Sequence, residues 1–115
     1  MGINSTEVAY GFGQMGSILT NAAEDSITSN GVAGFESAVF VAITFVEDTV
    51  FDNTTGLVPE DTTKFFGSDA PAAAGIDVNG WLVTDGIVFP AGLTIYGRWT
   101  EVDLLSGVVI AYVGY

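Results

Sequence analysis

The chain has 115 residues, of which 49% are hydrophobic and 14% charged, and its 14 acidic and 2 basic residues give a formal net charge of −12. A charge of this sign and size repels phosphate backbones and anionic bilayers, which argues against nucleic acid and membrane as partners. Histidine and cysteine are absent, which excludes an imidazole base, a Ser–His–Asp triad, a thiol nucleophile and a thiolate zinc site.

The same composition bears on assembly. Soluble domains carry about 25% charged residues, so this chain has more apolar surface than a small monomer readily buries. We therefore expect other subunits to cover part of it, in a homo-oligomer such as a trimer. Many copies with this net charge repel one another unless salt screens them. We therefore expect either a saline environment or a partner with a basic surface.

Residues 1–35 are rich in Gly, Ser, Thr and Asn and are predicted to form an N-terminal arm or edge segment that packs on a neighbour. A short strand at 7–12 and a short helix at 17–24, capped by Ser17, are expected within it. Residues 11–16 match the dinucleotide-binding pattern G-x-G-x-x-G. Because no βαβ unit follows, we interpret these glycines as turn or packing residues and expect no bound cofactor.

Residues 36–115 are predicted to form a single β domain. The run 36–51 is β-branched and apolar on both faces, which is typical of a strand buried on both sides. One face is expected to carry Val39, Val41, Ile43 and Phe45, and the other Phe40, Ala42 and Val46. Residues 52–56 then form a turn, and 57–75 are the most loop-like segment, which Phe65 and Phe66 can attach to the core or to another subunit.

Turn chemistry organises the second half of the chain. Asn79-Gly80 predicts a type I′ hairpin that pairs Val78 with Trp81. A second turn is expected at 89–92 with Pro90 at its first corner, and a third at 106–107 that joins 101–105 to 108–113 as a hairpin. The alternation in 93–100 places two sets of residues on opposite faces, namely Leu93, Ile95 and Trp99 against Thr94, Tyr96 and Arg98. Six or seven short strands in all predict an all-β antiparallel sandwich or small barrel.

Candidate sites in the acidic segments have a simple interpretation. The pairs Glu47-Asp48 and Glu60-Asp61, and Asp52 with Asn53, could offer oxygens to calcium. No D-x-D-x-D-G series is present, so we interpret them as solvated charges and expect no metal site. Paired carboxylates of a glycan-active enzyme are the catalytic alternative, but we assign no catalytic residue.

Arg98 lies on a strand and is the only arginine in the chain. We expect it to form an ion pair with Glu101, Asp103 or an acid of another subunit, the alternative being a side chain that simply points into water. Its neighbour Gly97 is expected to permit close packing against Trp99 or a partner strand, with a simple bulge as the alternative.

Two parts of the sequence resemble segments of a known group. Residues 45–51, FVEDTVF, resemble a strand of the type LEDTVF. Residues 89–100, FPAGLTIYGRWT, followed by 105–112, LSGVVIAY, resemble an ending of the type IPAGTTIYGRWT…LTSGxVIAY. This pairing is similar to small virion proteins of tailed bacteriophages, many of them marine and often encoded among head genes. The resemblance covers 39–56 and 87–114 and implies a structural role in the virion rather than a reaction.

From the resemblance we expect a decoration protein that binds the major capsid protein on the head exterior. A tail- or fibre-associated virion component is the alternative, and a carboxylate-based glycan-active enzyme a more distant one. The residues that we expect to have structural or interface roles are Phe45, Phe51, Trp81, Tyr96, Gly97, Arg98, Trp99 and Tyr112.

Overall fold

The computed structural model describes residues 16–22, 27–29, 38–52, 55–68 and 82–114. Eight strands and no α-helix occur in these ranges. The strands are β1 (Ser17–Asn21), β2 (Ile27–Thr28), β3 (Val39–Phe45), β4 (Val50–Phe51), β5 (Leu57–Pro59), β6 (Thr94–Val102), β7 (Leu104–Ser106) and β8 (Val108–Gly114). The predictions that fall on 7–12, on the Asn79-Gly80 hairpin and on Trp81 lie outside the described residues.

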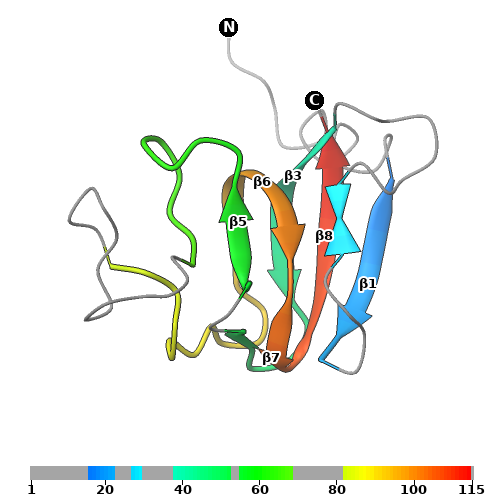
Figure 1. The fold of residues 1–115 in the computed structure, drawn as a ribbon. Helices are drawn as coiled ribbons and strands as arrows, with labels where there is room; N and C mark the ends of the chain where they lie inside the picture. Colours follow the sequence, from blue (N-terminus) through cyan, green and yellow to red (C-terminus); the bar gives the residue numbers. More distant parts are fainter. Residues whose placement is uncertain (1–15, 23–26, 30–37, 53–54, 69–81, 115) are drawn as a thin grey trace, which may run out of the picture.

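The strands form one large antiparallel sheet in the order β1-β8-β3-β6-β2, in which β5 also pairs with β6 (Figure 1). This sheet curls into a nearly closed, barrel-like shape, and a small second sheet pairs β4 with β7. The all-β prediction is therefore confirmed.

Strand β3 lies between β8 and β6, and its apolar side chains are largely buried. The predicted alternation of faces is wrong in its first half. The pairing with β8 changes register between Phe40 and Ala42, so Val41 is an extra residue in the ladder. As a result Phe40 joins Ile43 and Phe45 in the core. Val46, expected to be a buried strand residue, follows the strand and is 48% exposed.

Aromatic rings fill one end of the core. The ring of Phe45 stacks on Phe89 with centroids 4.9 Å apart, and the ring of Phe51 meets both of these rings edge-on at 5.9 and 5.3 Å. Edge-to-face and offset-stacked arrangements are the favoured geometries of aromatic pairs. Residues that are far apart in the sequence, on β3, β4 and the segment before β6, are thereby held together.

The predicted helix at 17–24 is wrong over its first five residues, which form strand β1 and pair with β8 from Ser17–Tyr112 to Asn21–Val108. Ile18 and Thr20 turn towards the interior, and this alternation is that of a strand with one buried face. β2 pairs with the end of β6. The described parts of 1–35 are thus strands of the main sheet, with β1 at its edge.

Two turns differ in detail from their predictions. The amide of Leu93 donates to the carbonyl of Pro90 and Gly92 has φ +90°, so the turn spans 90–93, one residue later than expected, with glycine at the corner that requires positive φ. The turn at 106–107 forms, with Gly107 at φ +101°. However, β7 pairs with β4 rather than with β8, so the hairpin prediction is wrong.

Candidate interaction surfaces

The predicted structural residues separate into core and surface. The side chains of Phe45, Phe51 and Trp99 are fully buried, so they stabilise the fold and are not available to a partner. Tyr96 is 63% exposed, and Tyr112 on β8 is half-buried.

Trp99 is attached to the loop that follows β5. Its indole Nε1 donates a hydrogen bond of 2.8 Å to the carbonyl of Phe66, and the rings of the two residues meet edge-on with centroids 5.5 Å apart. The prediction that Phe66 attaches this segment to the core is therefore confirmed. The segment is less loop-like than expected because its first residues form β5.

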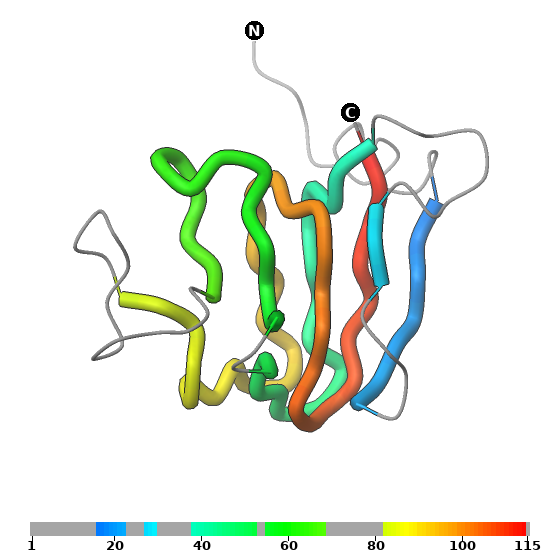
Figure 2. Tube along the Cα trace, viewed as in Figure 1, coloured from blue at the N-terminus to red at the C-terminus, as the bar shows by residue number. Residues whose placement is uncertain are grey.

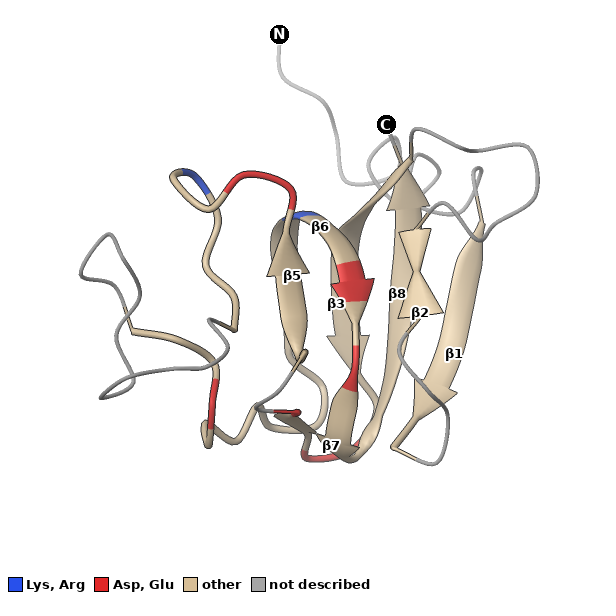
Figure 3. Ribbon diagram, in the orientation of Figure 1, with Lys and Arg blue, Asp and Glu red and all other residues tan. Residues whose placement is uncertain are grey.

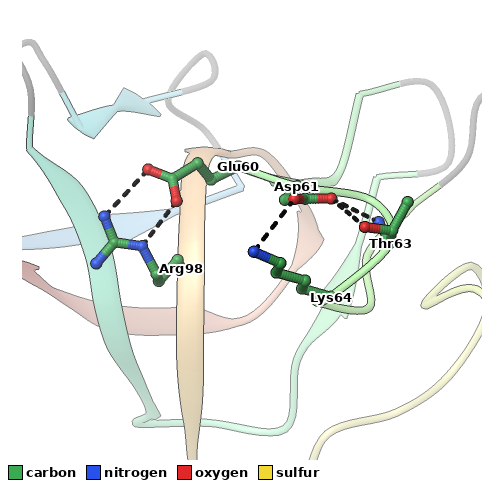
Figure 4. A network of polar contacts seen from close by, with 5 residues as sticks. All are labelled: Glu60, Asp61, Thr63, Lys64 and Arg98. Carbon is green, nitrogen blue, oxygen red and sulfur yellow. Dashed lines mark hydrogen bonds and ion pairs between the residues drawn. The ribbon is translucent and has the colours of Figure 1, made fainter.

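Arg98 forms the predicted ion pair, but its partner is Glu60 and not Glu101, Asp103 or an acid of another subunit. Its Nε and Nη2 donate to the two carboxylate oxygens of Glu60 at 2.7 and 3.1 Å (Figure 4). The hydrogen bond from Arg98 is the main cause that lowers the pKa of Glu60 below its ordinary value. Glu60 follows β5, which pairs with the C-terminal part of β6. The pairing of these two strands therefore brings Glu60 and Arg98 together.

Other acids of the candidate calcium pairs are engaged in loop contacts. Asp61 accepts hydrogen bonds from the amide and the hydroxyl of Thr63. The bond from the hydroxyl is the main cause that lowers the pKa of Asp61. The Nζ atom of Lys64 lies 3.9 Å from Oδ2 of Asp61 (Figure 4). Asp48 accepts the amide of Ala91 at 2.9 Å. In the described ranges no group of three or more acidic side chains is arranged to hold a metal ion.

Segments that carry exposed apolar residues meet at one end of the barrel, which we call the loop-end surface. Eight large apolar side chains are exposed among the described residues. Five of them define this surface: Val46, Ile87, Val88, Leu93 and Leu105. The segments that carry them meet at the lower end of the tube in Figure 2.

Backbone hydrogen bonds hold these segments together. The amide of Val46 donates to the carbonyl of Val108, and the amide of Phe45 donates to that of Leu93, each at 2.9 Å. Thr49 and Phe89 exchange a pair of bonds at 2.9 and 2.8 Å. The exposed acids Glu47 and Asp48 lie in the same loop as Val46. The segments of the loop-end surface therefore bring exposed apolar residues and the exposed acids Glu47 and Asp48 to the same end of the barrel.

A second surface is the side of the main sheet that faces away from the core, which we call the outer sheet face. Residues directly opposite one another in antiparallel strands lie on the same side of a sheet. The registers of β1, β8, β3 and β6 define two rows across this face: Leu19, Ile110, Thr44 and Thr94, and then Ser17, Tyr112, Ala42 and Tyr96.

The outer sheet face carries no charge in these rows. β1, β3 and β8 contain no charged residue at all, and Figure 3 shows them in tan, without blue or red. Ala42 is fully buried although it lies outside the core cluster, and it lies opposite Tyr112 on one neighbouring strand and Tyr96 on the other. Next to these rows a hollow of about 180 Å³ is lined by Leu19, Thr20, Asn21 and Val108.

Neither surface is predicted as a unit from the sequence. The alternation in 17–21 and 108–112 is the signal that would have located the outer sheet face. Within the described ranges, no helix has the length and apolar character needed to cross a bilayer. Comparison of the chain with protein-family models, curated proteins and solved structures found no match.

Proposed function

We propose that this chain is a structural protein of a tailed-phage virion that binds the head exterior as a decoration protein, in several copies and without catalysing a reaction. The sequence resemblance of 39–56 and 87–114 to small phage virion proteins supports this role. The partner is the major capsid protein, and the protein is located in the virion.

The loop-end surface is the observation that carries the proposal. Large exposed apolar side chains gathered in one area are typical of protein interaction sites. Glu47 and Asp48 are exposed beside this area, and they favour a partner with basic groups around an apolar centre. A capsid subunit with such a surface is the partner that fits.

The absence of histidine and cysteine from the sequence also favours binding over catalysis. Carboxylates are the remaining candidates for acid–base chemistry. Glu60, Asp61 and Asp48 already accept hydrogen bonds from their own chain, so these carboxylates organise loops.

Binding to particles tests the proposal. Heads and tails would be purified from a phage in which the gene for this chain is deleted, mixed separately with the labelled full-length chain, and sedimented. We expect saturable binding to heads, weakened by Val88→Asp and Leu105→Asp, whose side chains are 58% and 59% exposed and lie outside the core. Absence of binding to heads, or binding to tails alone, contradicts the proposal.

A further inference from the structure

We propose that the outer sheet face is the surface through which one copy of this chain binds a second copy. The inference rests on the proposed function, since a decoration protein acts in many copies, and it identifies the surface that joins them. It assigns self-association to the sheet and leaves the loop-end surface for the head.

The absence of charge on the outer sheet face favours a second copy of this chain as its partner. Each copy has a formal net charge of −12, so contact between two acidic surfaces brings carboxylates together at a cost. The three neighbouring strands β1, β8 and β3 contain no charged residue. On β6, Arg98 is already paired with Glu60, and Glu101 lies near the far end of the strand. This face therefore allows two equally acidic molecules to meet without opposing charges of the same sign.

The side chains on this face suit an interface. Tyr96 and Leu19 are 63% and 68% exposed, and tyrosine provides a large contact area with little rotamer freedom to lose. The hydroxyl groups of Thr44 and Thr94 are hydrogen-bonded to each other at 2.9 Å. Covering these two hydroxyls therefore leaves neither without a partner.

The edge of the sheet offers a further contact. Among the described strands, β1 lies at one end of the sheet path, and the hollow beside Leu19 and Val108 lies where β1 meets β8. An apolar side chain of a second copy can enter this hollow while its tyrosines contact the rows. By contrast, a basic partner is attracted to the acids of the loop-end surface, which the outer sheet face lacks.

The experiment compares Leu19 on the outer sheet face with Leu105 on the loop-end surface, two leucines of similar exposure. Leu19→Glu and Tyr96→Glu place charge on the outer sheet face, whereas Leu105→Glu, on a side chain 59% exposed, places it on the loop-end surface. Sedimentation equilibrium of the full-length chain and of each variant would be measured at about 0.1 M and about 1 M NaCl, where the Debye length falls from about 10 Å to about 3 Å. Circular dichroism verifies that each variant is folded.

We expect the unmodified chain to self-associate, more tightly at high salt. Leu19→Glu and Tyr96→Glu should each raise the dissociation constant by on the order of a hundredfold, since each buries an unpaired charge, and Leu105→Glu should leave it unchanged. A chain that is monomeric at both salt concentrations overturns the inference, as does dissociation by Leu105→Glu alone.

Head binding separates this inference from the proposed function. If the chain binds heads but Leu19→Glu and Tyr96→Glu leave its oligomeric state unchanged, the inference fails and the proposed function stands. If these variants lose head binding while they keep the oligomeric state, the outer sheet face binds the capsid instead and the inference again fails. If the chain does not bind heads but Leu19→Glu and Tyr96→Glu dissociate its oligomer, the proposed function fails and the self-association surface stands.

Discussion

The indole ring of Trp99 lies directly over Gly97, two residues earlier on the same strand. A β-carbon at position 97 would lie 2.8 Å from both Cζ2 and Cη2 of Trp99. The pairing of β3 with β6 also changes register between Tyr96 and Trp99, so a bulge in β6 accompanies the contact. Both readings of Gly97, close packing on Trp99 and a bulge, therefore hold together.

Gly97→Ala is expected to destabilise the protein by about 1–3 kcal/mol, because the added methyl group overlaps a ring that is fully buried and cannot move freely. Unfolding in urea, followed by far-UV circular dichroism, measures the change. Gly86→Ala is the control for steric overlap, since Gly86 has φ +74° with open space around it and its replacement adds only backbone strain.

A double-mutant cycle with Trp99→Phe isolates the contact. The ring atoms nearest to position 97 belong to the six-membered part of the indole, which phenylalanine does not extend into the same place. We therefore expect Gly97→Ala to cost less in the Trp99→Phe background than in the unmodified chain. Equal costs in both backgrounds would show that the ring does not restrict position 97.

Ser68→Ala is expected to destabilise the protein by about 1–3 kcal/mol, since the Ser68 hydroxyl accepts the amide of buried Leu57 and its loss leaves that donor unpaired. Thr84→Val removes only the 2.7 Å bond between the Ser68 and Thr84 hydroxyls and should cost less. Denaturant unfolding of both variants and of the double variant provides the ranking. A larger loss for Thr84→Val contradicts this assignment.

Stability should depend on pH through Glu60. Its pKa is lowered in the folded protein, mainly by the hydrogen bond from Arg98, so the carboxylate stabilises the fold at pH values above its ordinary pKa. This contribution is lost as the pH falls through the lowered value. Glu60→Gln should therefore lower the melting temperature at near-neutral pH, and this difference should shrink as the pH falls through the lowered pKa of Glu60.

Titration by NMR gives an independent measurement of this group. The side-chain carboxyl resonance of Glu60 should have a midpoint below that of a glutamate in an unfolded peptide. Glu47→Gln, a change at an exposed glutamate elsewhere in the chain, is the control for the melting measurements on Glu60→Gln. A Glu60 midpoint at or above the peptide value would mean that the pair with Arg98 does not form in solution.

Salt should stabilise the fold. With a formal net charge of −12, repulsion among the negative charges destabilises the compact folded state, and screening by salt reduces this repulsion. The melting temperature is expected to rise by several degrees between about 0.05 M and about 1 M NaCl. Tetramethylammonium chloride should have the same effect if screening is the cause, whereas stabilisation by NaCl alone would indicate specific cation binding.

Local sequence determined much of the architecture. The β-branched apolar run in 36–51, the alternation in 93–100 and the glycines at 92 and 107 predict strands and turns, because strand period and turn geometry depend on only a few neighbouring residues. The lone arginine predicted an ion pair, since a guanidinium among many carboxylates finds one of them. The all-β class followed from these features together.

Tertiary structure decided the pairings. Segment 17–21 is a strand because β8 provides a pairing edge, which outweighs a weak local helical tendency. Arg98 meets Glu60 because β5 lies beside β6, and a bulge at Val41 moves Phe40 into the core. The outer sheet face exists only once β1, β8, β3 and β6 lie side by side. Such contacts join residues distant in sequence, so they depend on the packing of the whole sheet and not on any local pattern.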